Sequence, residues 1–176
     1  MADIVSTMVQ VHVARFSAAP DFSSPFGSVS TAHLQPEHLL LRRSVTEPLF
    51  PLLWQCITGR KTANETAVQT ALRELQEESS LNPLRMWTLP YVSHWYDTAN
   101  DAVELVPCFG ILVSADATVH LSHEHNCFSW ASLDDATEQL VIPAHKHCMI
   151  LFHHLLMEIQ QSSLSALSLV YEIPLR

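Results

Sequence analysis

The segment GRKTANETAVQTALRELQEESSL, residues 59–81, decides how this chain folds. Small and apolar residues recur through its middle at a helical spacing. At about 100° per residue they share one stripe of a helix: Ala67, Val68, Ala71, Leu72 and Leu75. The second half of the segment carries an arginine and a cluster of acidic residues: Arg73, Glu74, Glu77 and Glu78. The pattern predicts an amphipathic helix whose acidic end needs an explanation.

The direction of the glutamates follows from the same helical geometry. Taking Ala67 as zero, Glu78 lies at about 20° and Glu74 at about −20°, beside the apolar stripe. Glu77 lies about 60° further out, near Arg73. A wholly solvated charged face would place Glu74 and Glu78 on the opposite side of the helix. We therefore expect these two carboxylates to face the protein interior.

Carboxylates spaced i, i+3 and i+4 repel one another, and burying them is costly unless a positive charge neutralises them. Mg²⁺ and Mn²⁺ are hard ions that carboxylate oxygens bind well. The spacing of Glu74, Glu77 and Glu78 therefore predicts a site for divalent metal. The alternative is an ordinary solvated helix with an acidic end. Thr62 followed by Glu65 fits a capping box, which predicts that the helix begins there.

Composition and charge narrow the class of protein. A chain of 176 residues with 48% hydrophobic and 15% charged residues fits one globular domain, 1–176, with a core over about 3–161 and a tail over 162–176. No apolar run approaches the roughly 20 residues of a membrane span. The net charge of −9 argues against nucleic acid as a partner. It permits a small phosphorylated partner, provided that divalent cations lie between the two anions.

The N-terminus and the cysteines suggest a cellular compartment. The first 16 residues lack the basic and apolar regions of a secretory signal. The four cysteines are scattered, without a CxxC pair, which is typical of reduced thiols. We therefore expect a cytoplasmic protein.

The remaining chain predicts a mixture of strands and helices. Strands are expected over 4–16, 39–44, 54–58, 85–97, 102–115 and 126–130. The pair 85–97 and 102–115 reads as an antiparallel hairpin around Asn100 and Asp101, with Pro90 and Pro107 confined to edges or bulges. An irregular loop is expected over 17–37, a short helical turn over 132–140, and an amphipathic helix over 142–161 with Pro143 in its first turn. The order of these elements predicts a mixed α/β protein.

The opening segment resembles the Nudix box, Gly-x5-Glu-x7-Arg-Glu-apolar-x-Glu-Glu-x-Gly-apolar. The matching positions are Gly59, Glu65, Arg73, Glu74, Leu75, Glu77, Glu78 and Leu81. Ser80 replaces the last glycine, at a turn where glycine supplies a left-handed conformation. Arg60 stands where a second glycine is usual beside Gly59. The resemblance implies an α/β/α sandwich around a mixed sheet, with a loop-helix-loop catalytic motif.

Within the Nudix family, the chain is similar to the dihydroneopterin triphosphate pyrophosphatases. These share Trp-Gln-x-x-Thr-Gly before the box, here WQCITG at 54–59. They also have a Glu-His pair before a tryptophan-containing strand, here Glu124 and His125 ahead of Trp130. The glutamate of that pair is a further metal ligand in the subgroup, and the resemblance carries this role to Glu124.

The resemblance implies a function for each position of the box. Glu74 and Glu78 would bind Mg²⁺ or Mn²⁺, and Glu77 would be a further ligand or the base that orients water. Glu124 would bind the same metals or act as the base. Arg73 would hold the glutamates through salt bridges, with Glu65 as a candidate partner.

Two positions of the box carry structural rather than catalytic roles. Gly59 would let the loop approach the metal site, and Leu75 is the apolar position of the helix.

Arg42 and Arg43 are weaker candidates for binding a substrate phosphate, since adjacent strand residues face opposite sides. Trp95 or Tyr96 could stack on a base or a pterin ring.

The implied function is a Mg²⁺-dependent pyrophosphohydrolase that cleaves a nucleoside or pterin triphosphate, or another compound linked to a nucleoside diphosphate. The partner is then a small phosphoanhydride, and a homodimer with a second copy of the chain stays open. The rival hypothesis is a Nudix-fold nucleotide-binding or regulatory module that has lost hydrolysis. Ser80 and Arg60 motivate the rival, whereas the complete set of glutamates favours the enzyme.

Overall fold

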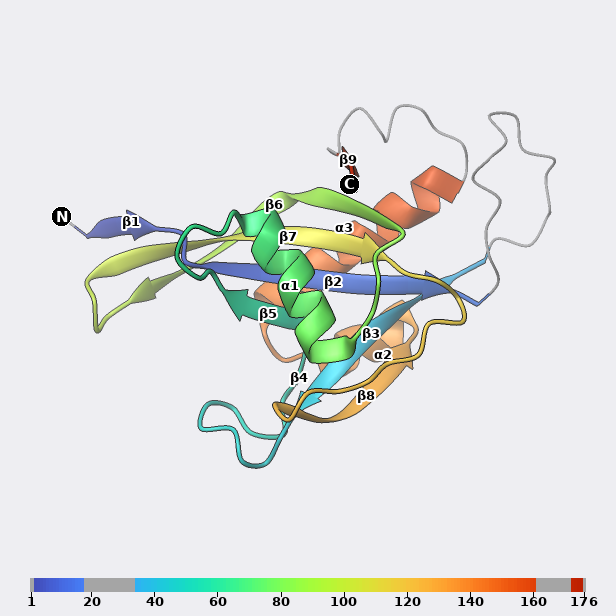
Figure 1. Cartoon of the computed structure of the whole chain (residues 1–176), viewed down its shortest axis with the longest axis horizontal. Coiled ribbons are helices and arrows are strands. Elements are labelled where there is room, and N and C mark those ends of the chain that lie inside the picture. The colour runs from blue at the N-terminus through green and yellow to red at the C-terminus, as the bar shows by residue number, and fades with distance from the viewer. Residues whose placement is uncertain (1, 18–33, 161–171, 176) are drawn as a thin grey trace.

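The computed structural model of the chain describes residues 2–17, 34–160 and 172–175. A mixed sheet runs through the molecule, with one helix packed on one face and two helices on the other (Figure 1). The expected α/β/α sandwich is confirmed. Most of the predicted loop over 17–37, and the greater part of the tail over 162–176, lie outside the described residues.

The described strands are β1 (Asp3–Val5), β2 (Met8–Phe16), β3 (Pro36–Arg43), β4 (Trp54–Gln55), β5 (Ile57–Arg60), β6 (Arg85–Asp97), β7 (Ala102–Leu112), β8 (His125–Ala131) and β9 (Glu172–Ile173). The described helices are α1 (Ala67–Ser79), α2 (Leu133–Gln139) and α3 (Pro143–Gln160). None of these described helices has both the length and the apolar composition needed to cross a membrane.

Strand β2 changes its partner along its length. Its first half, from Met8 to Val11, pairs antiparallel with β5, and its second half, from Ala14 to Phe16, pairs antiparallel with β3. Its other edge pairs parallel with β7. The main path of the sheet runs β4-β3-β2-β7-β6-β9, with β8 on β3 and β1 on β7. The sheet therefore forks where β3 and β5 leave the same edge of β2, and β5 leads directly into the loop before α1.

Both faces of the central strands are apolar, because successive side chains of a buried strand point to opposite faces. On β2, Val9, Val11 and Val13 join the cluster that includes Ala71 and Leu75 of α1. The alternate residues of β2 face the other way. There, Ala14 and Phe16 share a cluster with Cys148 and Phe152 of α3, and α2 completes this layer with α3.

The predicted hairpin is confirmed, since β6 and β7 pair antiparallel and Asp101 adopts a φ of 49° in the turn. The register shifts between Thr88 and Val92, where Pro90 cannot donate a hydrogen bond. The expectation for Pro107 is confirmed as well, because Pro107 pairs with Val92 where this register shift ends, although β7 is a central strand. Pro107 is tolerated there because it lies between the stretch of β7 paired with β1 and the stretch paired with β2.

Two other predicted elements differ in detail from the structure. The single strand expected over 4–16 is divided into β1 and β2. Thr7, in the break, donates from its backbone nitrogen and its hydroxyl to the buried carboxylate of Glu104 on β7. The helix expected over 142–161 is confirmed as α3 and begins at Pro143.

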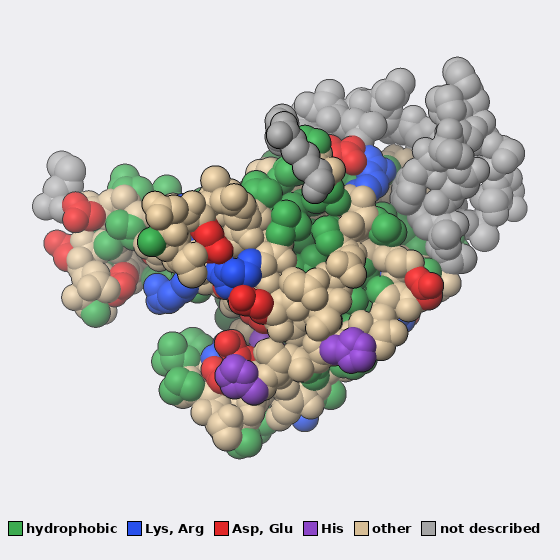
Figure 2. Space-filling view, in the orientation of Figure 1, with side chains coloured by type: hydrophobic (Ala, Val, Ile, Leu, Met, Phe, Trp, Pro, Cys, Tyr) green, Lys and Arg blue, Asp and Glu red, His purple; other side chains and the backbone are tan. Residues whose placement is uncertain are grey.

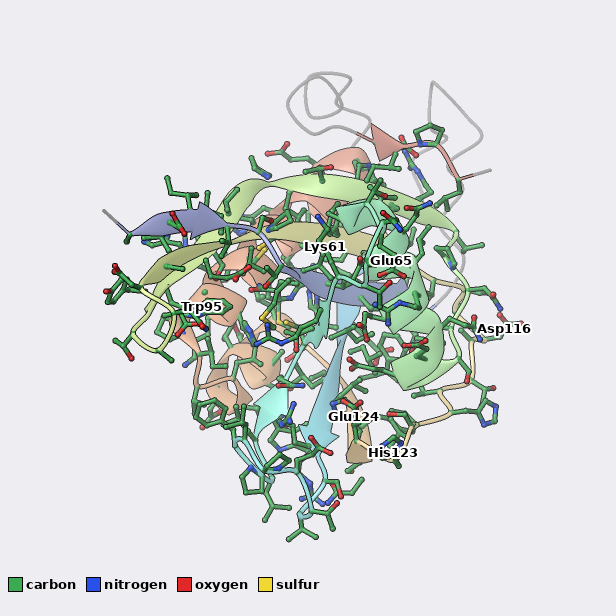
Figure 3. All side chains as sticks on the ribbon, turned by 60° about the vertical axis from the view of Figure 1, so that its left-hand side comes forward. Lys61, Glu65, Trp95, Asp116, His123 and Glu124 are labelled. Atoms are coloured by element: carbon green, nitrogen blue, oxygen red, sulfur yellow. The ribbon has the colours of Figure 1, made fainter. Side chains whose placement is uncertain are left out.

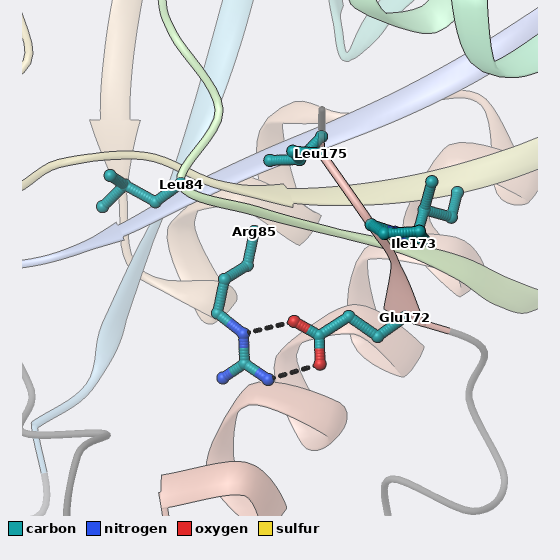
Figure 4. Close-up of a pocket in the computed structure, with 6 residues that line it drawn as sticks. Leu84, Arg85, Glu172, Ile173 and Leu175 are labelled. Carbon is teal, nitrogen blue, oxygen red and sulfur yellow. Dashed lines mark hydrogen bonds and ion pairs between the residues drawn. The ribbon is translucent and has the colours of Figure 1, made fainter.

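Strand β9 lies against the outer part of β6, opposite Met86 and Trp87. Arg85 and Glu172 form a two-point ion pair there, with both N–O distances at 2.7 Å (Figure 4). A cavity of about 460 Å³ is lined by this pair together with Leu84, Ile173, Pro174 and Leu175. The cavity contains none of the acidic residues of segment 59–81, so it is separate from the site built on α1.

Several histidines are buried on the face of the sheet that α2 and α3 cover. The set comprises His12, His38, His145 and His153. His38 Nε2 lies 3.1 Å from His153 Nδ1, and His12 Nε2 lies 2.7 Å from the side-chain nitrogen of Gln10. Burial lowers the pKa of all four, to about 3 for His38 and about 4 for His145. These imidazoles are therefore neutral parts of the core.

Acidification is expected to destabilise the fold through these four histidines. When the pH falls below the ordinary histidine pKa of 6.5, these histidines are protonated in the unfolded chain but stay neutral in the folded chain. The free energy of unfolding therefore falls as pH falls. Each group contributes up to about 1.4 kcal/mol per pH unit. Urea unfolding between pH 7 and pH 5 measures the slope.

The matched variants are His145→Leu, which removes a buried histidine, and His123→Leu, which removes an exposed one. His145→Leu should give a shallower dependence of stability on pH, and His123→Leu should leave the dependence unchanged. An equal slope in wild type and His145→Leu would contradict the buried neutral assignment.

Candidate active and metal site

Helix α1 begins later than the sequence predicts. Thr66 caps it, with its side chain accepting from the Gln69 nitrogen, and the Gln69 side chain accepts in return from the Thr66 nitrogen. The predicted capping box of Thr62 and Glu65 is therefore wrong. Those two residues form the turn before the helix, where the Thr62 nitrogen donates to Glu65. Gln69, and not Glu65, is the capping-box partner of the N-cap residue. The Glu65 carboxylate therefore accepts a hydrogen bond from Arg73.

The predicted left-handed turn after α1 is confirmed. Ser80 ends the helix with a φ of 57° and a ψ of 20°, and its nitrogen donates to the Gln76 carbonyl. The serine thus adopts the conformation that the missing glycine would adopt, at some backbone strain. Two backbone bonds hold the chain that follows β7 against this end: His120 donates to the Ser79 carbonyl, and Ser122 donates to the Glu78 carbonyl.

The inner edge of α1 is acidic, as the helical geometry predicts. Glu78 is 3% exposed. The side chain of Glu74 is 12% exposed, whereas that of Glu77 is 56% exposed. Glu74 and Glu78 therefore face the protein, and Glu77 faces solvent. On the molecular surface in Figure 2, acidic, basic and histidine side chains lie close together, with hydrophobic side chains beside them.

Gly59 makes room for Glu74. It lies within strand β5 rather than in a loop, and a Cβ at this position would meet the carboxyl carbon of Glu74 at 2.0 Å. No side chain larger than hydrogen fits unless Glu74 moves away. Gly59 has an ordinary negative φ, so the requirement for glycine is the close approach and not the backbone conformation.

Arg73 joins the loop, the strand and the helix. Its guanidinium contacts Glu65 at 2.8 Å, Glu74 at 2.9 Å and Glu77 at 2.7 Å. It also donates to the backbone carbonyl of Arg60. The predicted salt bridge with Glu65 is present, and Arg73 lowers the pKa of Glu65 to about 2. Since its donors are already shared among these groups, Arg73 cannot also neutralise Glu78.

Glu78 is a buried carboxylate in unfavourable surroundings. Burial raises its pKa well above the ordinary value, and the nearby charges of Glu74 and Glu124 raise it further. Its Oε2 has no hydrogen-bond partner among the described residues and lies 3.7 Å from Nδ1 of His125. Burial lowers the pKa of His125 to about 4, so this histidine is neutral and supplies no counter-charge.

Glu124 comes to the same place from a distant part of the sequence. Its carbonyl accepts from the Ser44 nitrogen after β3, and its nitrogen bonds the Ser122 hydroxyl. Its charge acts on both Glu74 and Glu78, raising the pKa of each. Figure 3 shows Glu124 and His123 on the segment that enters β8, below the end of α1. Glu124 is therefore close enough to act electrostatically on both inner glutamates of α1.

The two arginines at the end of β3 have different partners, and a register shift in the pairing of β3 with β8 lies between them. Arg43 is the positive charge that lowers the pKa of Glu78, and its guanidinium binds Glu47 at 2.7 Å and the Leu49 carbonyl at 2.8 Å. Arg42 instead stacks over the Trp54 ring at 5.6 Å and donates to Asn126. The charge of Arg43 therefore acts on Glu78, whereas the described contacts of Arg42 are to Trp54 and Asn126.

The predicted aromatic residues lie outside this cluster. Trp95 and Tyr96 are exposed on β6, near its turn into β7, and the Tyr96 hydroxyl donates to Asp101. Figure 3 shows Trp95 well apart from Glu124. The structure does not bring either ring to the carboxylates.

Gln55 is a site residue that the sequence analysis missed, and His125 is one to which it gave no role. The Gln55 side-chain nitrogen lies 3.3 Å from His125 Nε2, and both side chains are buried. Both belong to the short motifs that carry the resemblance, WQCITG and Glu-His. That shared occurrence was the available signal, but only the fold shows that the two residues touch.

The donor set fits a divalent cation, although the side chains are not gathered around one. Within the described ranges no three His, Cys, Asp or Glu side chains are placed together closely enough to hold a metal ion. Arg73 binds Glu74 and Glu77, which holds those carboxylates toward its own guanidinium. Glu78 keeps a raised pKa beside Glu74 and Glu124 even though the charge of Arg43 lowers it in part. Oxygen ligands of this kind suit Mg²⁺ or Mn²⁺.

The fold and this acidic cluster place the chain in a known class. A family model described as NUDIX domain matches residues 27–152. The chain belongs to this family, and its mixed sheet between helices is the fold that membership implies.

The chain is also similar to a curated relative and to solved structures. The chain is similar to an octanoyltransferase from Myxococcus xanthus, with 35% identity over 132 residues, 68% of this chain and 34% of that protein. It thus spans about a third of that relative. A C. elegans Ap4A hydrolase complex superposes with a TM-score of 0.63 at 20% identity, covering 86% of this chain and 98% of the other. A Listeria monocytogenes structure described as a NUDIX hydrolase gives 0.66 at 18%, covering 89% and 97%.

The similarity to dihydroneopterin triphosphate pyrophosphatases is weaker in structure than the sequence motifs imply. The E. coli dihydroneopterin triphosphate pyrophosphohydrolase superposes with a TM-score of 0.55 at 16% identity, covering 85% of this chain and 99% of that one. At such identities these superpositions establish the shared fold.

Gly59→Ala is expected to weaken divalent-metal binding, because the added methyl group must displace the Glu74 carboxylate. We expect at least ~10-fold weaker Mn²⁺ binding, comparable to loss of a group that orients a ligand. Electron paramagnetic resonance of free Mn²⁺ measures the affinity directly.

Gly110→Ala is the matched control. A Cβ at Gly110 would meet the Phe152 ring at 2.4 Å, on the opposite face of the sheet, so this variant strains the core without touching Glu74. It should lower the melting temperature while the Mn²⁺ affinity of the folded protein stays unchanged. Equal Mn²⁺ affinity in wild type and Gly59→Ala would contradict the role given to Gly59.

Proposed function

We propose that the chain is a Mg²⁺-dependent pyrophosphohydrolase that cleaves a nucleoside or pterin triphosphate, or another compound linked to a nucleoside diphosphate. The observation that supports this most strongly is the burial of Glu78, whose Oε2 has no hydrogen-bond partner among the described residues and which is exposed to the charges of Glu74 and Glu124. Their mutual repulsion in a buried setting is relieved by a cation. The same cation lets a protein of net charge −9 approach a polyphosphate.

Glu74, Glu78 and Glu124 are the residues that would hold Mg²⁺ or Mn²⁺. When bound, the metal neutralises phosphate oxygens and the leaving phosphate in an attack of water on phosphorus. Glu77 is more exposed, so in this proposal its carboxylate is a further ligand or orients and deprotonates the attacking water. Glu124 can take that basic role if it does not bind metal.

Arg73 and Arg43 would serve the site without taking part in proton transfer. Arg73 holds Glu74 and Glu77 through ion pairs of 2.9 and 2.7 Å, which limits the conformations of both carboxylates. Arg43 acts electrostatically on Glu78 and is therefore the better candidate of the strand pair for a substrate phosphate. To do so it would have to release Glu47 or the Leu49 carbonyl.

The pterin triphosphate is the substrate favoured by the motifs. WQCITG at 54–59 and the pair Glu124-His125 are features shared with the dihydroneopterin triphosphate pyrophosphatases. The structure adds that these two motifs touch, through Gln55 and His125. A nucleoside triphosphate or diadenosine polyphosphate presents the same phosphoanhydride to the same carboxylates, so the substrate must be tested directly.

A substrate panel tests the proposed function. The purified protein with Mg²⁺ is incubated with dNTPs, dihydroneopterin triphosphate, ADP-ribose, diadenosine tetraphosphate and coenzyme A, and phosphate release is measured. We expect Mg²⁺-dependent turnover of at least one compound, with pterin triphosphate the best. If none is hydrolysed but one raises the melting temperature, the protein is a binding module instead.

Glu78→Gln should separate stability from activity. In EDTA the variant should melt at a higher temperature than wild type, because a neutral amide removes a buried charge from beside Glu74 and Glu124. It should also lose the stabilisation by Mg²⁺ and reduce turnover by several orders of magnitude. Thermal melts with and without Mg²⁺, and phosphate release, measure the three effects. Unchanged turnover would remove Glu78 from the set of metal ligands.

A further inference from the structure

Two buried polar atoms face each other at the end of α1 without a bond. Oε2 of Glu78 and Nδ1 of His125 are both buried, lie 3.7 Å apart, and have no other hydrogen-bond partner among the described residues. Their side chains come from α1 and β8, elements that are distant in sequence. A buried polar atom of this kind destabilises the fold if it stays unpaired. Pairing the two removes both costs.

The second nitrogen of the imidazole decides which atom carries the proton. A neutral histidine has one donor nitrogen and one acceptor nitrogen. The Gln55 side-chain nitrogen, 3.3 Å from Nε2, can only donate, so Nε2 accepts and Nδ1 bears the hydrogen. The opposite tautomer would direct the Nδ1 lone pair at a carboxylate, which is repulsive. Gln55, at Nε2, and Glu78, at Nδ1, therefore favour the same tautomer of His125, the one with its hydrogen on Nδ1.

We propose that His125 is a positioning residue for Glu78: held by Gln55, its Nδ1–H donates to Oε2 and orients the carboxylate toward the cation shared with Glu74 and Glu124. The hydrogen bond occupies one lone pair of Oε2 and comes from a neutral donor. The negative charge of the carboxylate is therefore still to be compensated by the cation. The inference rests on the proposed metal site. It deepens that site by assigning a function to Gln55 on β4 and His125 on β8.

The shape of the histidine ring supplies a discriminating pair of variants. The amide of asparagine can take the place of Nδ1–H, whereas leucine keeps a similar volume and has no donor. We expect His125→Leu to weaken Mn²⁺ binding by ~10–100-fold, the usual effect of losing a group that orients a ligand. His125→Asn should recover most of the affinity. The probe is Mn²⁺ alone, followed by electron paramagnetic resonance without substrate.

Two controls distinguish positioning from general damage. His123→Leu changes an exposed histidine two positions earlier in the chain and should bind Mn²⁺ like wild type. Gln55→Leu should weaken binding in the wild-type background and add little in the His125→Leu background, because Gln55 acts through the imidazole. Melting temperatures in EDTA show whether each variant is folded.

The possible results all bear on the proposal. Wild-type affinity in His125→Leu, equal weakening in His125→Asn and His125→Leu, or no Mn²⁺ binding by wild type would each overturn it. If wild type binds Mn²⁺ and the variants follow the expected order while no compound of the panel is hydrolysed, the positioning role stands and the proposed hydrolysis fails.

Discussion

The structure depends on one electrostatic constraint, the burial of carboxylates at the inner edge of α1. A carboxylate loses favourable hydration when it is buried, and neighbouring carboxylates increase that loss. Glu78 experiences both effects, and Arg73 is already engaged with Glu65, Glu74 and Glu77. Several features of the fold serve to maintain this costly arrangement. Gly59 leaves space for Glu74, and the chain before β8 is bonded to the last turn of the helix.

The two faces of the sheet handle polar groups in different ways. The face covered by α2 and α3 holds neutral histidines: His12, His38, His145 and His153. A buried histidine can lose its proton near neutral pH. On the face covered by α1, the glutamates would have to take up protons to become neutral. A bound cation can compensate their charge without protonation. The polar face with carboxylates is therefore the one suited to binding a charged ligand, whereas the histidine face serves the core.

Much of the site was predictable because it depends on local geometry. The helical period alone turns Glu74 and Glu78 inward and Glu77 outward, and the structure agrees. The left-handed turn at Ser80 also follows from a short-range rule. The start of α1 was predicted wrongly at Thr62, because two overlapping sequence patterns each fit a cap. Only Thr66 with Gln69 forms the reciprocal pair of bonds.

The sequence by itself determined the family, the class of fold and the acidic edge of one helix, since each follows from residues spaced a few positions apart along the chain. Tertiary structure alone decided which distant groups meet that edge. Gln55, Glu124 and His125 join α1 because β2 exchanges β5 for β3 along its length, and β3 pairs with β4 on one edge and with β8 on the other. Trp95 and Tyr96 were excluded in the same way, because the β6–β7 hairpin carries them elsewhere. Contacts between segments far apart in the chain depend on strand order and register, which residue spacing does not encode.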